Sequence, residues 1–367
     1  MTEPLRMGLV GLGVGASQLL PALSSGTHSR LVAIADVRAE ARERAAAELG
    51  VAVFDSVEAL CDSEVVEAVW VATPNQWHAR HAIAALERGK HVIVSKPLAI
   101  TLEEADAMVE AAERNGRQLL AGHSQSMAPT IRTMAQLVRS GELGKLGMVH
   151  TWHYTDWLYR PRLPAELDVR QGGGPVFRQA SHQVDIVRSI VGQPVRSVRA
   201  MTVDLDPARG IAGAYTVYLD FEDATPASIV YSGYGHLDLA AWLRGAEPAT
   251  PRRGQPEQDE AARKDALRYG SGGSRGANTL GLFGLTVVSC ERADLLEARD
   301  GVQVCRAEGR ELLEVADEVR GTAELAELQT AVRGGTRVVH DGRWGRATLA
   351  VCLAIHASAE RRADISP

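Results

Sequence analysis

The chain has 367 residues and a formal net charge of −6, without long runs of like charge. This length exceeds what one hydrophobic core usually organises, so we expect two domains, and the charge balance offers no basic surface for nucleic acid or a membrane. No apolar run approaches the ~20 residues of a membrane span, and the first residues lead into a strand pattern instead of a signal peptide, which predicts a cytoplasmic protein.

The most informative motif lies near the start of the chain. An apolar run at 7–10 leads into Gly11-Leu12-Gly13-Val14-Gly15-Ala16, and a second apolar run at 31–35 ends at Asp36. A strand, a glycine turn, a helix and a second strand in this order build a dinucleotide site, with the phosphates at the helix N-terminus. The alternative is an ordinary turn of an α/β domain.

Asp36 follows the glycine motif at roughly the 20-residue spacing of a carboxylate that accepts the ribose hydroxyls. A carboxylate at this position repels a 2′-phosphate, so it favours NAD over NADP. Arg38 lies close by and leaves NADP possible.

Strand and helix patterns alternate from residue 7 to about Gly122. Such alternation is typical of a mostly parallel sheet covered on both faces, with ligands bound at the carboxyl ends of the strands. The expected strands are 7–11, 31–35, 66–72, 91–94 and 118–121, and the expected helices are 39–49, 77–88 and 103–115.

After Gly122 the pattern changes to period-two alternation, which predicts an open, mostly antiparallel sheet. The expected strands are 146–155, 195–206, 213–222, 226–234, 284–291 and 302–306, and the expected helices are 129–140, one from near Gln179, 322–333 and 345–361. The polar segment 244–278, rich in Gly and Pro, is predicted to be a long mobile loop.

The predicted fold class is therefore α/β, with an N-terminal Rossmann domain (1–122) that binds NAD(P) and a C-terminal α+β domain (123–367) that carries the open sheet. The four cysteines, which are predicted to be reduced, are scattered singly, and no metal site is predicted.

Several motifs together resemble the Gfo/Idh/MocA oxidoreductases along essentially the whole chain. They are the glycine turn, Ala72-Thr73-Pro74-Asn75-Gln76-Trp77-His78, the run 85–92 leading into Ser95-Lys96-Pro97, and Gly172-Gly173-Gly174 with His182 and Asp185. The resemblance implies bound NAD(H) or NADP(H), a small-molecule substrate, a second domain that serves substrate binding and oligomerisation, and a homodimer or homotetramer. Within the family, the chain is most similar to the phthalate 4,5-cis-dihydrodiol dehydrogenase-like branch.

Two positions depart from the family pattern. Ser95 replaces the glutamate of the usual Glu-Lys-Pro, and Arg178 stands where many sugar-specific relatives carry aspartate. A cation at this position suits an anionic substrate, whereas an aspartate would bind sugar hydroxyls. The alternative for Arg178 is a salt bridge between domains or subunits.

These patterns and the resemblance give three sets of candidate residues. The predicted catalytic residues are Lys96 and His182 for proton transfer and Asp185 to orient His182. The predicted substrate-binding residues are Arg178, His153, Asp156, Trp152 and Gln179. The predicted cofactor-binding residues are Gly11, Gly13, Val14, Gly15, Asp36, Val37, Arg38, Thr73, Pro74, Asn75, His78, Ser95, Lys96, Pro97 and Gln125.

The predicted function is NAD(P)-dependent oxidation of a carbinol of a cyclic, carboxylated substrate such as a phthalate-type cis-dihydrodiol. The enzyme class would be an oxidoreductase acting on CH–OH or CH–CH groups. Three alternatives stay open: a sugar, inositol or uronate dehydrogenase of the same family; a lyase or hydrolase that uses tightly bound NAD transiently; and a sensor without catalysis that binds a nucleotide.

Overall fold

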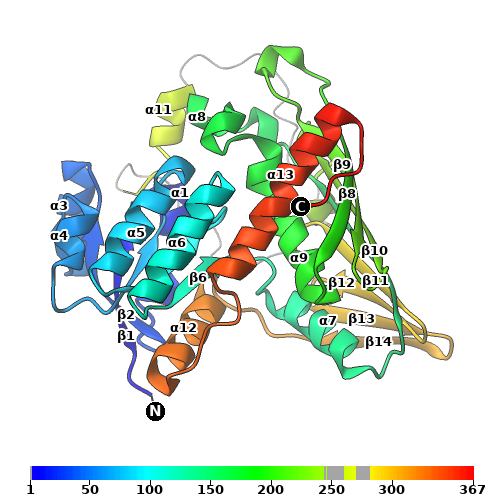
Figure 1. Ribbon diagram of the computed structural model, residues 1–367, viewed down its shortest axis with the longest axis horizontal. Coiled ribbons are helices and arrows are strands. Elements are labelled where there is room, and N and C mark those ends of the chain that lie inside the picture. The colour runs from blue at the N-terminus through cyan, green and yellow to red at the C-terminus, as the bar shows by residue number, and fades with distance from the viewer. Residues whose placement is uncertain (1, 244, 246–259, 270–281) are drawn as a thin grey trace. The chain divides into compact units, whose positions relative to one another are not determined.

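Two sheets organise the chain, and each belongs to its own unit (Figure 1). The computed structural model describes residues 2–243, 245, 260–269 and 282–367. Of these, the first unit contains residues 2–124, 261–269 and 319–349, and the second contains the rest. The return of 319–349 to the first unit differs from the single boundary expected at residue 122.

The first sheet is parallel and runs in the order β3-β2-β1-β4-β5-β6. This is the doubly wound arrangement, whose strand order reverses between β1 and β4 and places ligand sites at the carboxyl ends of the strands. Its strands are β1 (Leu5–Val10), β2 (Ser29–Ala35), β3 (Ala52–Phe54), β4 (Ala68–Val71), β5 (His91–Ser95) and β6 (Leu119–Gly122).

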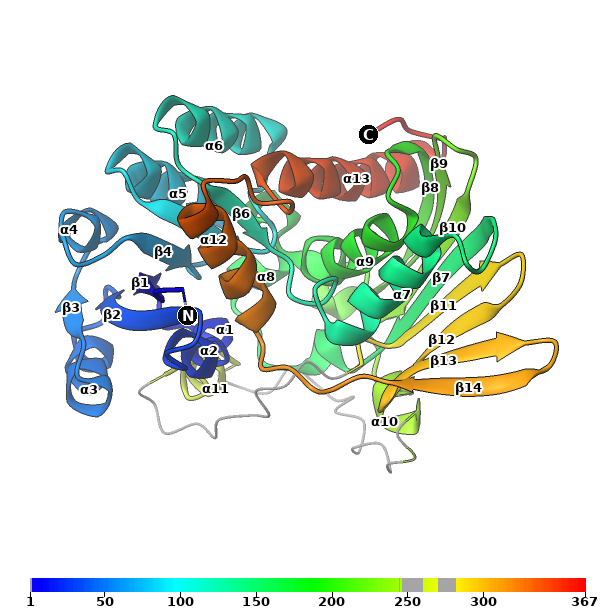
Figure 2. The same cartoon turned by 90° about the horizontal axis from the view of Figure 1, so that it is seen from below.

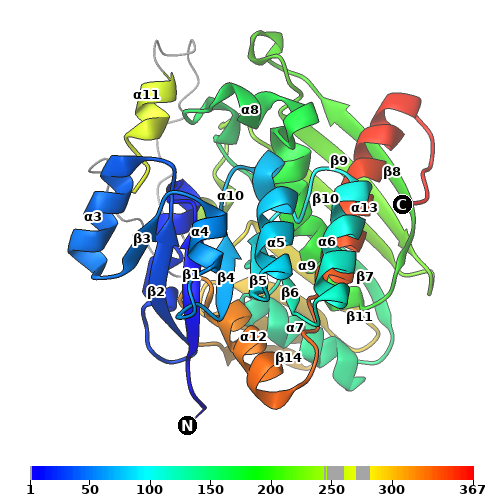
Figure 3. The same cartoon turned by 60° about the vertical axis from the view of Figure 1, so that its left-hand side comes forward.

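Helices cover both faces of this sheet. Helices α4 (Val57–Cys61), α5 (His78–Glu87) and α6 (Leu102–Arg114) form one layer, which lies nearest the viewer in Figure 3. The other face buries Leu5, Met7 and Leu9 against α2 (Leu20–Leu23), α3 (Ala39–Leu49) and α12 (Thr322–Gly334). Alternate residues of β1 therefore face two hydrophobic layers, as a doubly covered strand requires.

The second sheet runs in the order β14-β13-β12-β11-β7-β10-β9-β8. All its pairs are antiparallel except β7 with β10, so the predicted mostly antiparallel sheet is confirmed. The strands are β7 (Leu146–Tyr154), β8 (Val195–Val203), β9 (Ala214–Phe221), β10 (Pro226–Ser232), β11 (Leu285–Cys290), β12 (Asp294–Ala298), β13 (Gly301–Arg306) and β14 (Gly309–Glu314).

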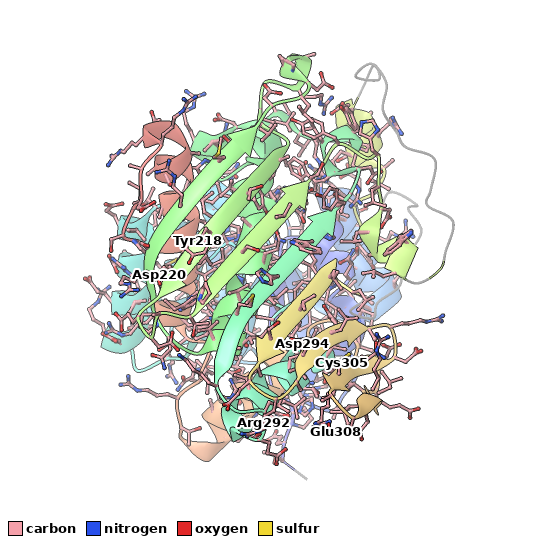
Figure 4. The ribbon with its side chains drawn as sticks, turned by 90° about the vertical axis from the view of Figure 1, so that its right-hand side faces the viewer. Tyr218, Asp220, Arg292, Asp294, Cys305 and Glu308 are labelled. Carbon is pink, nitrogen blue, oxygen red and sulfur yellow. The ribbon has the colours of Figure 1, made fainter. Side chains whose placement is uncertain are left out.

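Among the described residues, the long helices of the second unit pack against one face of its sheet. Helices α7 (Pro129–Ser140) and α9 (Ser181–Val191), with the second half of α13 (Gly342–Arg361), lie on this face in Figure 2 and bury Val149, Val217 and Ile229. Figure 4 shows the opposite face, where Tyr218 and Asp220 of β9 and Cys305 of β13 lie with no described helix over them. The shorter elements of this unit are η2 (Trp157–Tyr159), α8 (Pro164–Leu167), η3 (Val169–Gln171), η4 (Val176–Ala180), η5 (Pro207–Arg209) and α10 (Leu239–Leu243).

Several elements differ from the sequence prediction. The glycine turn is followed by two single turns of helix, α1 (Val14–Ser17) and α2, because Pro21 cannot continue the first helix in its interior. Strands β3, β12 and β14 were not predicted. In the segment 244–278, residues 260–269 are described and contain α11 (Glu260–Asp265), so a loop is wrong for that part; 245 is a turn, and the remainder lies outside the described residues.

Strand β12 was missed for a physical reason that also makes it testable. Its sequence, Asp-Leu-Leu-Glu-Ala, favours helix by composition, and one of its two buried positions is the carboxylic acid Glu297. Thr130 of α7 donates its hydroxyl to Glu297 Oε1 at 2.7 Å. Burial raises the pKa of Glu297, against the opposing effect of hydrogen bonds from Thr130 and Thr286.

We expect Glu297→Gln to stabilise the second unit at high pH. The folded-state pKa lies above the unfolded value, so the folded state binds the extra proton, and stability falls as the pH rises above the unfolded pKa. An uncharged amide removes this loss and keeps an acceptor for Thr130. The melting temperature of the variant relative to wild type should rise by about 2–8 °C between pH 5 and pH 8.5, measured by differential scanning calorimetry.

The control for this measurement is Glu311→Gln, because Glu311 lies exposed on β14. Its melting temperature should follow wild type at both pH values. If the melting temperatures of Glu297→Gln and wild type differ by the same amount at pH 5 and at pH 8.5, then Glu297 is ionised in the folded protein throughout this range.

Candidate functional site

The glycine turn joins β1 to α1 and has the geometry of a nucleotide-binding loop. Gly11 has a φ of +90°, and a Cβ there would lie 3.0 Å from Thr73 Cγ2 and 3.1 Å from the Ala72 carbonyl oxygen. A residue with a side chain would therefore strain the turn and push β4 away. A Cβ at Gly13 or Gly15 would meet no neighbouring atom within 4 Å, so their backbone faces open space that a pyrophosphate can approach.

The helix after the turn differs from the expectation of a long helix that receives the phosphates. Helix α1 has four residues, and Ala16 on it is fully buried in the first unit's core. So short a helix has little dipole, since the macrodipole is the sum of aligned peptide units. The backbone N–H groups of the turn itself are therefore the groups available to a phosphate.

Asp36 directly follows β2 and is hydrogen-bonded to the glycine turn. Its Oδ2 accepts the Leu12 N–H at 2.6 Å, and its Oδ1 accepts the backbone N–H and Nε–H of Arg38 at 2.9 and 3.1 Å. Arg38 also donates from Nη2 to the Leu12 carbonyl at 2.9 Å. Asp36 and Arg38 thus form one network with the turn, while Val37 between them is 86% exposed.

His78 links two loops at the carboxyl ends of neighbouring strands. Its Nδ1 lies 2.7 Å from the Pro97 carbonyl, after β5, and its Nε2 lies 2.8 Å from the Thr73 carbonyl, after β4. The ring is 1% exposed. Two carbonyl contacts and deep burial suit a residue that holds the loops together, and the predicted role of His78 in cofactor binding stays a prediction.

The remaining predicted residues of this edge lie on the same two loops. Asn75 begins a short helical turn (η1, Asn75–Trp77) directly after Pro74. The Ser95 hydroxyl, which replaces the family's glutamate, accepts the Nε1–H of the buried Trp70 at 3.1 Å. Lys96 is half-buried beside Pro97, to which it is joined by a cis peptide bond. Ser95 therefore has a packing role at the end of β5, whatever it does toward a cofactor.

In the second unit, Arg178 lies on η4, a stretch of π-helix that continues directly into α9. Such π-helical turns occur most often at functional sites, because the wider turn re-aims its side chains. The Arg178 guanidinium pairs with Glu166 of α8, a carboxylate with 9% side-chain exposure. Arg178 therefore forms a salt bridge in this structure. The alternative expected such a salt bridge between domains or subunits, whereas Glu166 belongs to the same unit as Arg178.

Glu166 is shared with a second arginine. Arg162 Nη1 lies 3.6 Å from Glu166 Oε1, its guanidinium stacks on Trp157 at 4.1 Å, and it donates to the Trp157 carbonyl at 3.0 and 3.1 Å. Burial lowers the pKa of Arg162 to about 10, with Glu166 opposing and the nearby Arg178 and Arg160 adding to the shift. Arg162 remains charged at neutral pH, so two guanidinium groups share one buried carboxylate.

His182 and Asp185 lie on α9 and are both buried, with exposures of 8% and 0%. Ser126 donates its hydroxyl to Asp185 Oδ2, and Arg188 Nη1 lies 3.7 Å from Asp185 Oδ1. These partners fix Asp185 between α9 and the segment before α7. The orienting role of Asp185 toward His182 stays a prediction.

The predicted substrate-binding residues do not all face one way. His153 of β7 is buried on the helix-covered face, whereas Trp152 is 42% exposed on the opposite face, because successive strand residues alternate. Trp152 and His153 therefore lie on different faces of the sheet, and a role of Trp152 in substrate binding stays a prediction. Asp156 accepts from Arg160 Nε at 2.6 Å, Gln179 is half-buried on η4, and Gln125 is buried at the start of the second unit.

Two residues that sequence reasoning missed lie at this site. Glu166 neutralises part of the arginine charge, and its only signal was its place four residues after Arg162. Phe283 packs its ring 4.2 Å from the ring of His153 and 4.8 Å from that of His182. Phe283 lies two residues before the start of β11 and about one hundred residues after His182. No local sequence pattern could therefore connect these two residues.

Comparison with known proteins agrees with this geometry. Residues 5–123 match the model of the oxidoreductase family with an NAD-binding Rossmann fold, and residues 131–249 match that of the Gfo/Idh/MocA C-terminal domain. A Comamonas testosteroni protein, 1-carboxy-3-chloro-3,4-dihydroxycyclohexa-1,5-diene dehydrogenase, is 36% identical over 96% of this chain and 94% of its own.

Solved structures show the same fold. A Bordetella bronchiseptica RB50 protein assigned as a dehydrogenase superposes with a TM-score of 0.93 at 36% identity, covering 99% of this chain and 100% of its own. The WlbA dehydrogenase of Bordetella pertussis, solved with NADH and UDP-GlcNAcA, gives a TM-score of 0.74 at 22% identity, covering 99% of each chain. No helix in the described part of this chain is long and apolar enough to cross a membrane. The chain belongs to the Gfo/Idh/MocA family and is an NAD-binding oxidoreductase.

Proposed function

We propose that this enzyme oxidises one ring CH–OH group of a cyclic, carboxylated vicinal diol, with NAD as the hydride acceptor. The observation that carries the proposal is that two guanidinium groups, those of the buried Arg162 and the half-buried Arg178, meet at the carboxylate of Glu166. A carboxylate brought by the substrate would accept charge-assisted, bidentate hydrogen bonds from guanidinium groups placed in this way. The Comamonas relative supports the class, since its name describes a carboxylated dihydroxycyclohexadiene.

The wider charge balance around these arginines supports an anionic substrate. Among the described residues, Arg160 pairs with Asp156 and Arg209 with Glu260, while Glu260 also accepts the backbone N–H of Arg162. Each of these outer arginines has its own carboxylate. Arg162 and Arg178 differ from these outer arginines because both meet at one carboxylate, that of Glu166.

The proposed division of roles follows the residue chemistry. Bound NAD supplies the hydride acceptor, the glycine turn holds its pyrophosphate, and the loops joined by His78 border it. Lys96 and His182 are the proposed groups that take the hydroxyl proton, since an amine and an imidazole are the side chains suited to that transfer. NAD is preferred to NADP because Asp36 and the Leu12 carbonyl already engage the Arg38 guanidinium that a 2′-phosphate would need.

The function is tested by the absorbance of reduced nicotinamide, with NAD or NADP and a panel of substrates. We expect NAD reduction by cis-dihydroxycyclohexadiene carboxylates and far less by neutral inositols or sugars. Lys96→Ala and His182→Gln should each lower kcat by about 10²- to 10⁴-fold, the usual range for acid–base groups, and leave NAD binding by calorimetry intact.

The matched control in this assay is Lys145→Ala, because Lys145 is exposed in the second unit. Reduction by uronates in place of ring diols would overturn the substrate class. Tight NAD binding without net reduction by any compound would favour transient redox chemistry or a sensor. Full turnover by Lys96→Ala would remove its proposed role.

Arg178 gives a second prediction, specific to the substrate's carboxylate. We expect Arg178→Gln to lower kcat/KM for a carboxylated diol by about 10- to 100-fold, since a charged hydrogen bond contributes about 1.5–3 kcal/mol. The uncharged methyl ester should be much less affected. Arg170→Gln is the control, because Arg170 pairs with Asp168 at 91% side-chain exposure. Equal losses for acid and ester would disprove an anion site at Arg178.

We also propose that the uncovered face of the second sheet (Figure 4) packs against a second copy of the chain. Its strands expose Met148, Trp152, Met201, Val203, Tyr218 and Leu312, with 40–64% of each residue accessible. Monomeric proteins rarely leave so many large apolar side chains on one face. A broad sheet face related to itself by a two-fold axis would bury them.

The prediction is that wild type has two or four times the chain mass of 39.4 kDa by light scattering, and that Met201→Glu with Tyr218→Glu reduces it to one. Val339→Glu serves as the control, since Val339 is 73% exposed in the first unit. A monomeric wild type, or an unchanged mass in the double variant, would contradict this interface.

A further inference from the structure

A buried imidazole on β7 has a nitrogen for which the described part of the chain provides no hydrogen-bond partner. His153 is 7% exposed, and its Nδ1 is buried with no hydrogen-bond partner among the residues that the structure describes. Buried polar atoms are nearly always paired, because an unmade hydrogen bond forfeits the solvation that the group had in water. Nδ1 is therefore open to a partner from beyond the described residues, such as a bound ligand.

Several buried polar groups near this atom are paired within the protein. The Tyr231 hydroxyl pairs with Thr155 Oγ1 at 2.9 Å, and the Tyr215 hydroxyl donates to Gln183 Oε1 at 2.7 Å. Gln183 in turn donates to the Thr151 carbonyl and hydroxyl. His153 lies two residues after Thr151 on the same face of β7, and its Nδ1 makes no such contact with the described residues.

Phe283 contacts both His153 and the proposed catalytic histidine, His182. Its ring stacks on His153 with centroids 4.2 Å apart and an interplanar angle of 26°, and meets His182 at 4.8 Å and 58°. One phenyl ring thus contacts both imidazoles, so the three form one aromatic cluster. A flat, partly unsaturated ring suits such a surface through stacking.

The backbone conformation next to Phe283 permits this contact. Gly284 has a φ of +81°, and a Cβ there would lie 2.1 Å from the Trp152 carbonyl oxygen and 3.0 Å from His153 Cα. Only glycine permits the chain to pass so close to β7. The close approach sets Phe283 directly over the His153 ring.

The protonation state of His153 determines what it can bind. Burial, with a smaller contribution from Arg160, lowers the pKa of His153 to about 3, so the ring is neutral at working pH. A neutral imidazole offers one donor and one acceptor, and a hydroxyl is its natural complement because it too can do both. A carboxylate would suit the charged arginines better.

We infer that His153 binds the hydroxyl of the diol that is not oxidised, while His182 serves the neighbouring hydroxyl that loses its hydrogen. The His153–Phe283–His182 cluster would then recognise two adjacent hydroxyls on a flat ring. His153 positions the substrate and moves no proton. This inference rests on the proposed function and adds to it the feature that selects a vicinal diol.

The test compares a dihydroxycyclohexadiene carboxylate with its analogue that has one ring hydroxyl. We expect His153→Phe to lower the ratio of kcat/KM for the diol to that for the mono-alcohol by about 10- to 100-fold, because one hydrogen bond to the second hydroxyl is lost. His153→Asn places an amide nitrogen near Nδ1 and should restore much of the ratio, whereas His153→Gln, which mimics Nε2, should not.

The melting temperature separates positioning from folding. His153→Phe keeps the stacking with Phe283 and removes an unpaired nitrogen, so it should melt no lower than wild type. His236→Asn, at an exposed histidine of the same unit, should leave the substrate ratio unchanged.

Three outcomes distinguish the two proposals. A wild type that oxidises no carboxylated diol overturns the proposed function, and this inference falls with it. A wild type that oxidises the diol, with equal losses for both substrates in His153→Phe, overturns the inference alone. A selective loss of the diol, rescued by asparagine, supports both.

Discussion

One buried amide determines where the proposed chemistry of the second unit is placed. Gln183 of α9 donates from Nε2 to the Thr151 carbonyl and hydroxyl on β7 and to the Val230 carbonyl on β10, and accepts the Tyr215 hydroxyl from β9. An amide whose donors and acceptor are all satisfied in a dry interior is strongly directional. It fixes the height and rotation of α9 on the sheet, and with them the adjacent His182.

Strand β7 then places its side chains on two faces with different roles. Val149, Thr151 and His153 face the helices, and Met148 and Trp152 face outward, because the side chains of a strand alternate. The inward residues hold α9 and contribute to the aromatic cluster, while the outward residues form part of the uncovered apolar face. A shift of one residue in the register of β7 would exchange the two sets, so the site and the proposed interface depend on the same register.

The sequence predicts well those features that are local. The parallel strands other than β3, helices 39–49 and 129–140, and the glycine turn with Asp36 follow from short-range patterns, and each lies where expected within a few residues. Strands β12 and β14 were missed because Glu297 interrupts the apolar face of one and charged residues cover the other. The pairing of Arg178 with Glu166 and the packing of Phe283 on His153 and His182 arise only when distant segments meet, and neither leaves a periodic signal.

The second unit contains two different polar environments: one holds the guanidinium groups of two arginines, and the other holds a neutral imidazole. The guanidinium groups of Arg162 and Arg178 meet at the carboxylate of Glu166, and that of Arg162 also stacks on the face of Trp157. Burial lowers the pKa of His153 to about 3, so this ring, which packs among aromatic rings, is neutral. A ring that carries both a carboxylate and adjacent hydroxyls matches this pair of environments: the arginines suit its anionic end, and the neutral imidazole suits a hydroxyl. A neutral polyol would offer the two arginines no anionic partner, and a simple aromatic acid would offer His153 Nδ1 no hydroxyl.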